Sequence, residues 1–377
     1  MLLDYETLKL IWWGLIGALL IGFAITGGMD LGVACLLPWV GKADEDRRIL
    51  LNSIGPTWEG NQVWLVTAGG ALFAAWPFAY AAAFSGFYLA MLLVLLALIL
   101  RPPGIDYRSK LPSKQWRNTW DAALFISGFL PALLFGVALG NLLLGVSFHF
   151  DDTLRIVNTG AFIDLLHPFA LGAGLVSVAM LCMQGGLFIQ MKTQGVLQQR
   201  ARTAVLCSGT LFIVLFCATG IASHFLDGYL IVSMPDSGSS FAPTEKIVEH
   251  VSQGMLSNFR TYPLLLIAPV LAFLACALAM VAAKAYWPFV GLVCSSICCA
   301  SVLATMAFAL FPFVMPSISQ PNHSLTIWDT VSSHRTLMYM LVAVAVFLPI
   351  VLAYTTWVFS IVRGKVTGQT INSTESY

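Results

Sequence analysis

The chain has 377 residues, of which 58% are apolar or aromatic and only 10% are charged. Its mean hydropathy is +0.84. This composition excludes a water-soluble globular protein and indicates an integral membrane protein. A formal net charge of +1 without a basic tract leaves no electrostatic basis for binding nucleic acid.

The first apolar run follows the stretch MLLDYETLKLIWW, which carries acidic residues where a secretory signal carries basic ones. The run is also much longer than the apolar core of a signal peptide. We therefore expect a retained membrane span at this position and no cleavage after it.

A hydrocarbon core requires about 20 apolar residues in each helical span. This length divides the chain into nine candidate spans: 8–39, 50–75, 79–100, 121–146, 161–190, 204–226, 262–283, 288–314 and 336–361. Helices are expected because a spanning backbone must satisfy its own hydrogen bonds, and the alternation typical of barrel strands is absent. The prediction is an all-α polytopic bundle with about nine transmembrane helices. It forms one integral membrane domain over residues 1–377, without a soluble domain.

The distribution of lysine and arginine tests whether the polar segment 50–75 spans, because these residues collect on the cytoplasmic side. With nine spans, one side holds Lys42, Arg47, Arg48, Arg101, Arg108, Lys110, Lys114, Arg117, Lys192, Arg200, Arg202, Lys284, Arg363 and Lys365. The other side holds only Lys9, Arg155, Lys246, Arg260 and Arg335. With eight spans, the first basic loop would face away from the others. We therefore expect nine spans, an outer N-terminus and a cytoplasmic C-terminus.

Three carboxylates stand at or near membrane depth. Asp30 precedes the inner end of the first span by about nine residues, or roughly 13 Å. Glu59 follows the inner start of the second span by a similar length, so the two side chains are expected to be neighbours. Asp106 lies at the cytoplasmic mouth of the third span. Buried ionisable groups are costly and are functional candidates by default, so we predict that these three residues transfer protons.

Structural roles remain open for the same residues. Glu59 could form polar contacts between helices together with Asn61 and Gln62, which support it in the sequence. Asp30 could pair with a cation of a partner subunit. Asp106 could form a surface ion pair with a nearby arginine such as Arg101.

The sequence offers no catalytic residue and no metal or cofactor site. The eight cysteines lie in apolar stretches without paired CxxC spacing, which favours a packing role. Haem in a membrane bundle is usually held by histidine near mid-helix. All six histidines fall in outer loops or at outer helix ends under the predicted topology: His149, His167, His224, His250, His323 and His334.

Several motifs give the chain a recognisable pattern. They include DYETLKLIWWGLIGALLIGFAITGGMDLGV near the start, WEGNQVWLVTAGGALFAAWPFAYAAAFSGFY, RPPGIDYRSK, FGVALGNLLLGV and, near the end, LFPFVMPS followed by SLTIWDTVSS. From about residue 4 to residue 360, the chain resembles subunit II of cytochrome bd-type ubiquinol oxidases.

The resemblance implies a bacterial inner-membrane terminal oxidase in which this chain pairs with subunit I. Subunit I carries the haems, of types b and d, and the quinol site, and it reduces dioxygen to water. Subunit II carries no haem, and its acidic residues at the positions of Asp106 and Glu59 belong to an inner proton path. Asp30 occupies a further acidic position of the pattern. A quinone on this chain and small single-span accessory subunits are further possibilities.

The chain departs from the family pattern at three points. Gly27-Gly28-Met29-Asp30 stands where relatives have Asp-Gly-Phe-Asp, Glu59 stands where Asp is frequent, and Thr57 replaces a frequent His. These departures leave the order of the proton relay open and would also suit a cyanide-insensitive branch. Two alternatives remain: a purely structural or assembly subunit of the same complex, and a secondary transporter, which should show binding groups in both halves.

Overall fold

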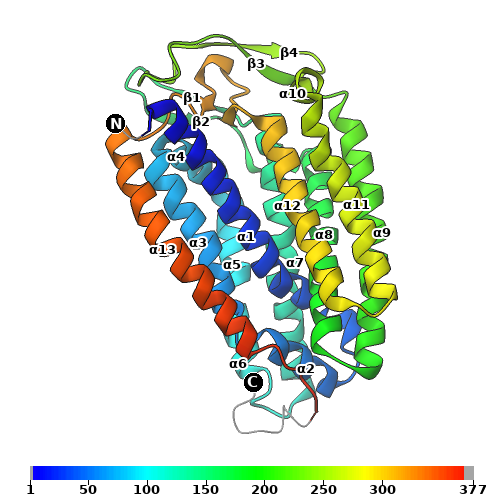
Figure 1. Cartoon of the computed structure of the whole chain (residues 1–377). Coiled ribbons are helices and arrows are strands. Elements are labelled where there is room, and N and C mark those ends of the chain that lie inside the picture. The colour runs from blue at the N-terminus through cyan, green and yellow to red at the C-terminus, as the bar shows by residue number, and fades with distance from the viewer. Residues whose placement is uncertain (1–2, 369–377) are drawn as a thin grey trace.

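The computed structural model describes residues 3–368, and Figure 1 shows that they form a bundle of long helices. The long helices are α1 (Tyr5–Val40), α3 (Trp58–Ala75), α7 (Lys114–Leu144), α8 (Pro168–Lys192), α9 (Gly195–Ser223), α11 (Ile267–Lys284), α12 (Pro288–Leu310) and α13 (His334–Ile361). The shorter helices are α2 (Asp44–Ile54), α4 (Pro77–Gly86), α5 (Tyr88–Leu98), α6 (Arg101–Tyr107), α10 (Ser257–Thr261), η1 (Phe162–Leu166), η2 (Pro263–Leu266) and η3 (Pro321–His323). The all-α fold expected from the sequence is confirmed.

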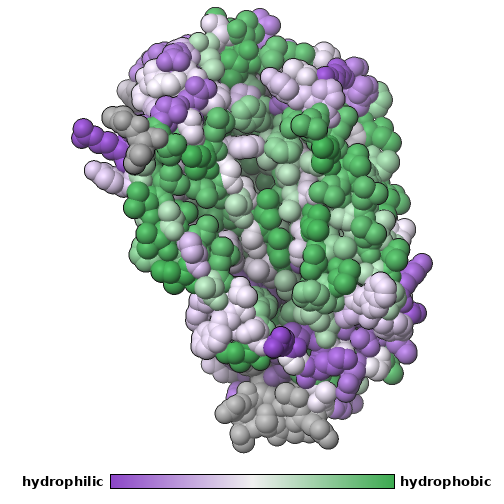
Figure 2. Space-filling model, viewed as in Figure 1, coloured by the Kyte–Doolittle hydropathy of each residue, from purple (hydrophilic) through white to green (hydrophobic). Residues whose placement is uncertain are grey.

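The two ends of the bundle differ in structure. One end, here called the hairpin end, carries three antiparallel strand pairs: β1 (Phe148–Phe150) with β2 (Ile156–Asn158), β3 (Gly228–Ser233) with β4 (Ile247–Val251), and β5 (Phe313–Met315) with β6 (Leu325–Thr326). The opposite end, here called the basic end, carries α2, α6 and the α8–α9 connection (Figure 1). On the face seen in Figure 2, a broad hydrophobic surface separates two ends that are richer in hydrophilic residues.

Eight segments within the described residues are long and apolar enough to cross a membrane. They are Tyr5–Val40, Tyr88–Tyr107, Lys114–Leu144, Pro168–Lys192, Gly195–Ser223, Pro263–Lys284, Pro288–Leu310 and His334–Ile361. Each overlaps one predicted span. The third span is shorter than predicted as a continuous helix, because the chain is interrupted at Phe87 between α4 and α5.

The remaining predicted span, residues 50–75, is not one helix, because residues 55–57 separate α2 from α3. The 18 residues of α3 extend about 27 Å, close to the thickness of a hydrocarbon core. Helix α3 starts at the basic end after α2. It finishes at the hairpin end, where the Ala75 carbonyl accepts a hydrogen bond from the Ser332 amide at 2.8 Å. The segment therefore traverses the bundle as a ninth passage, although its polar residues keep it below the hydropathy of the other eight.

Helix α1 lies against α8 at a very close distance. A Cβ atom added to Gly32 would lie 2.0 Å from the Leu181 carbonyl oxygen, and one added to Gly185 would lie 2.4 Å from the Gly32 carbonyl carbon. Only glycine allows two backbones to approach so closely, as is usual where membrane helices pack. This contact holds the middle of α1 inside the bundle, where it also contacts α3, α7 and α12.

A buried ion pair fastens the hairpin end. Lys246, which precedes β4, contacts Asp329 with 2.7 Å between Nζ and Oδ2, and both side chains are fully buried. The Asp329 carboxylate also accepts hydrogen bonds from the amide and hydroxyl of Thr326. Burial raises the pKa of the Asp329 carboxyl, and the charge of Lys246 opposes this rise. The pair joins the β3–β4 hairpin to the segment that leads into α13.

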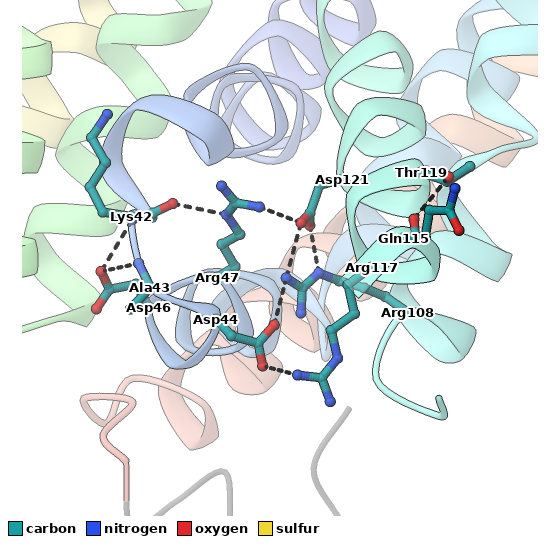
Figure 3. Close-up of polar contacts among 11 residues, drawn as sticks. Lys42, Ala43, Asp44, Asp46, Arg47, Arg108, Gln115, Arg117, Thr119 and Asp121 are labelled. Atoms are coloured by element: carbon teal, nitrogen blue, oxygen red, sulfur yellow. Dashed lines mark hydrogen bonds and ion pairs between the residues drawn. The ribbon is translucent and has the colours of Figure 1, made fainter. Parts of the chain in front are cut away.

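A second ionic cluster closes the basic end (Figure 3). Asp121, near the start of α7, contacts Arg47 of α2 and Arg108 after α6, both with 2.5 Å between nitrogen and oxygen. Asp44 contacts Arg108 at 3.0 Å and Arg117 at 2.7 Å. Burial lowers the pKa of the Arg108 guanidinium, but the negative charges and hydrogen bonds of Asp121 and Asp44 have the larger effect, so the pKa is raised overall. Three chain segments are therefore joined around one carboxylate.

The exchange Asp121→Asn keeps the shape of the side chain and removes the negative charge between Arg47 and Arg108. We expect a loss of about 3–5 kcal/mol in stability, because Arg47 loses its carboxylate contact and the buried Arg108 keeps only that of Asp44. The thermal unfolding midpoint of the purified protein measures the effect. Asp44→Asn is the matched control, since its carboxylate is 40% exposed and should matter less. An equal loss in both variants would contradict the central role of Asp121.

A double-mutant cycle tests the Lys246–Asp329 pair. Lys246→Met and Asp329→Asn each leave one buried polar group without its partner, so each should lower stability by about 3–5 kcal/mol. The double variant should lose clearly less than the sum of the two, because both members of the pair are removed together. Thermal unfolding of the four proteins gives the coupling, and strictly additive losses would show that the contact contributes no stability.

Candidate functional site

Asp30 lies at the centre of the bundle and is fully buried. Its carboxylate oxygen Oδ2 accepts a hydrogen bond of 2.9 Å from Nδ2 of Asn61 on α3. The second oxygen, Oδ1, is buried and has no hydrogen-bond partner within residues 3–368. The close approach of α1 to its neighbours explains this burial, and it leaves one acceptor of the acid free.

Arg101 is the cation of this site. It begins α6, is 1% exposed, and donates from Nη2 to the Ser127 carbonyl at 3.2 Å. It interacts electrostatically with Asp30, while its Nε is buried without a hydrogen-bond partner among the described residues. We call Asp30, Asn61, Arg101 and Ser127 the Asp30 cluster. A buried acid needs a cation or a polar partner to persist in hydrocarbon, and this cluster supplies both.

Glu59 does not belong to the Asp30 cluster. The depth expected from the sequence is right, since Asn61 lies two residues further along α3 and contacts Asp30. Two residues correspond to a rotation of roughly 200° around a helix, however, so Glu59 points to the opposite side. It is exposed on the outer surface of α3. The prediction that Glu59 and Asp30 are buried neighbours is therefore wrong.

The surface around Glu59 is largely apolar. Val63, Val66 and Phe73 follow Glu59 at helical spacing along α3, and their exposed fractions are 55%, 73% and 60%. Gln62 is half-buried, and its side chain forms no hydrogen bond within the described part of the chain. Of the polar residues that the sequence grouped with Glu59, only Asn61 faces the interior.

Asp106 is exposed on α6 at the basic end. The two arginines near it in the sequence face other partners: Arg101 donates to Ser127, and Arg108 contacts Asp121 and Asp44. The alternative in which Asp106 forms a structural ion pair with these arginines is therefore wrong. Its carboxylate stays accessible at the surface.

Asp121 and Gln184 are among the buried polar residues that the sequence analysis did not single out. Asp121 stands at the first position of a predicted span, where a carboxylate before an apolar run was a visible signal. Gln184 lies in the middle of α8, is fully buried, and donates to the Ile25 carbonyl at 3.2 Å and to the Ser296 hydroxyl at 3.0 Å. Gln184 therefore joins α8 to α1 and to α12.

The histidines do not fit a haem site inside the bundle. All six lie at the hairpin end: His149, His167, His224, His250, His323 and His334. Within residues 3–368 there is also no group of three or more His, Cys, Asp or Glu residues that could hold a metal ion. A haem between helices normally takes a histidine at mid-depth, and no such residue is present in the sequence.

Comparison with known proteins identifies the family. The profile of cytochrome bd terminal oxidase subunit II matches residues 8–362. The cytochrome bd-I ubiquinol oxidase subunit 2 of Escherichia coli K12 is 47% identical over 374 residues, which cover 98% of each chain. The probable cytochrome oxidase subunit 2 of Haemophilus influenzae is 46% identical over 364 residues, which cover 97% of this chain and 96% of the other.

A solved structure supports the same fold. A chain in the structure of the bd oxidase from Geobacillus thermodenitrificans aligns with a TM-score of 0.70 and covers 94% of this chain and 98% of its own length. Sequence identity in that alignment is 15%, so the comparison concerns the fold alone. The family profile and the two bacterial relatives, in contrast, match nearly the full length of the sequence. The chain therefore belongs to the family of subunit II of cytochrome bd terminal oxidases.

Proposed function

We propose that this chain is the haem-free subunit of a quinol:oxygen oxidoreductase. It pairs with the haem-bearing subunit I and helps to conduct cytoplasmic protons to the oxygen-reducing site. The observation that carries the proposal is Asp30, a fully buried acid with one free carboxylate oxygen, held beside Asn61 and Arg101. It lies ten residues, or about 15 Å, from the basic end of α1. A buried acid at this depth lowers the stability of the protein, so it is a functional candidate by default.

In this proposal the basic end faces the cytoplasm, because lysine and arginine favour that side of the membrane. Asp106 stands at this end, and Glu59 stands deeper on the outer surface of α3. Both acids are exposed in the isolated chain, so a partner has to cover them before they can guide protons. The exposed apolar residues Val63, Val66 and Phe73 suit such a contact. In this proposal the proton path uses the interface between the two subunits, at Asp106 and Glu59, as well as Asp30 in the interior of this chain.

Redox chemistry belongs to subunit I in this proposal. Haems b and d reside there, and quinol and oxygen react through the complex. The histidine positions in this chain agree with that division, because none lies within the middle of a span. This chain contributes acidic side chains and the surface that joins the two subunits.

A structural or assembly role is the second candidate. It is favoured by the position of Arg101, whose charge compensates Asp30 inside the bundle. A secondary transporter receives less support, because it should carry binding groups in both halves of the chain. The spans from residue 168 onwards contain no Asp or Glu.

Glu59→Gln tests the proton path in the assembled oxidase. The exchange keeps the size of the side chain but removes the proton that can be released, so oxygen consumption and membrane charging should fall by at least about tenfold. Both are measured with quinol in proteoliposomes that contain the complex. Glu249→Gln is the matched control, since Glu249 is an exposed glutamate in β4 at the hairpin end and should leave both rates unchanged.

The haem content of the same preparations separates the two candidates. Unchanged oxygen consumption and charging in a fully assembled, haem-replete Glu59→Gln complex would defeat the proton path. Loss of haem from the complex would instead favour the assembly role.

The absorption spectrum of the purified chain tests the division of cofactors. We expect no haem bands in the visible range when the chain is purified alone, because it lacks a histidine at mid-depth. Haem bands should accompany the chain only when it is purified together with subunit I. Stoichiometric haem in the isolated chain would contradict the proposal.

A further inference from the structure

A cavity at the hairpin end remains outside the function proposed above. It has a volume of about 280 Å³, close to the lower limit of roughly 300 Å³ for small-molecule sites. It lies among the end of α7, the β1–β2 hairpin, η1, the start of α8 and the β3–β4 hairpin. The lining residues that the argument uses are Asn141, Asn158, Asp164, His167, Asp227 and Tyr229.

Two amide oxygens in this cavity lack donors. Asn141 is 3% exposed and gives both amide hydrogens to the carbonyls of Val137 and Leu165, each at 2.8 Å. Its own oxygen accepts no hydrogen bond from residues 3–368. The oxygen of Asn158 is buried and also has no partner within these residues. A buried acceptor without a donor is costly, so the Asn158 oxygen favours a ligand that brings N–H or O–H groups, and the Asn141 oxygen can accept from the same ligand.

The charge of the lining is negative. Asp164 uses Oδ2 to accept the Ala161 amide at 2.7 Å, and Asp227 uses Oδ1 to accept the Gln253 amide at 3.2 Å. Each carboxylate therefore keeps acceptor capacity for another group. His250 stands 3.8 Å from the other oxygen of Asp227, and both side chains are about half exposed. No Lys or Arg lines the cavity.

The donors of the lining are already committed or few. The Tyr229 hydroxyl donates to the Leu144 carbonyl at 3.0 Å, and burial raises the pKa of this phenol to about 12, so it remains protonated. His167 accepts the Phe169 amide at Nδ1, which leaves Nε2 as its donor. Acceptors therefore outnumber donors. A cation with several N–H groups matches this set, whereas an anion does not.

We infer that this cavity binds a primary ammonium group, held by Asp164, Asp227 and the amide oxygens of Asn141 and Asn158. A phospholipid with an ethanolamine headgroup is one source of that chemistry, and a soluble amine is the other. The position favours the lipid, because the cavity lies where α7 ends and α8 begins. Its rim in η1 also exposes Ile163 and Leu166, with exposed fractions of 73% and 38%. These apolar side chains are placed to contact acyl chains while the headgroup enters the cavity.

The experiment is native mass spectrometry of the purified oxidase complex with short-chain phosphatidylethanolamine, phosphatidylcholine or free ethanolamine. The choline headgroup has a positive charge but no N–H donor, so it separates hydrogen bonding from charge. We expect a preference of about tenfold for phosphatidylethanolamine, as for one charge-assisted hydrogen bond. Displacement of the lipid by ethanolamine at similar concentration would assign the ammonium site to soluble amines.

Substitutions of the lining carboxylates test whether the lipid binds in this cavity. Asp227→Asn changes a half-exposed side chain and should reduce the preference severalfold, and its combination with Asp164→Asn should abolish it. Asp152→Asn is the matched control, since Asp152 is exposed at the same end and does not line the cavity. Oxygen consumption of the variants reports that the complex is intact. Equal binding of the ethanolamine and choline lipids by the unaltered complex, or a preference that Asp227→Asn and the double variant leave unchanged, would overturn the inference.

Discussion

A charge inside an apolar bundle must find its partner in another segment of the chain, and this requirement organises the structure. At the basic end, Asp121 contacts Arg47 of α2 and Arg108, which follows α6. At the hairpin end, Lys246 and Asp329 join two loops that are far apart in the sequence. Each contact joins segments that are distant in the sequence, because an unpaired buried charge would cost several kcal/mol. The helices between them pack through small residues.

Asp30 is also a buried acid with partners from other segments, but its hydrogen bonding is incomplete. Its partners Asn61 and Arg101 come from separate helices, but one of its oxygens and one nitrogen of Arg101 remain without hydrogen-bond partners among the described residues. In the ionic clusters at the two ends, both carboxylate oxygens of Asp121 and of Asp329 have partners. In our proposal, the carboxylate oxygen of Asp30 without a partner among the described residues is the one that exchanges a proton. It is also why Asp30 carries the proposed function although Glu59 is the more conspicuous residue in the sequence.

Membership of the family makes the chain a component of a membrane-bound oxidoreductase complex and implies a partner subunit I. A partner subunit would explain why α3 exposes both a carboxylate and large apolar side chains. A carboxylate among the exposed apolar residues Val63, Val66 and Phe73 would be energetically costly if this surface faced lipid. In the proposed complex, a partner subunit covers this surface, and protein groups and water at the interface can solvate the same acid. The cavity at the hairpin end is lined by other residues than this surface and is a separate site.

The sequence by itself determined the membrane class, the helical fold and the family, because each depends on hydropathy, spacing or motifs along the chain. It also predicted nine spans, of which eight segments of the described residues are long and apolar enough to cross a membrane. It also placed Asp30 and Glu59 at similar depth, since the rise per residue is constant in a helix. Only the tertiary structure decided which way each side chain points. Asn61 faces the interior and Glu59 the surface, because the rotation of α3 is set by its packing against α1. The partners of Asp121 and the acceptors of the hairpin-end cavity come from distant segments, so no local pattern could reveal them.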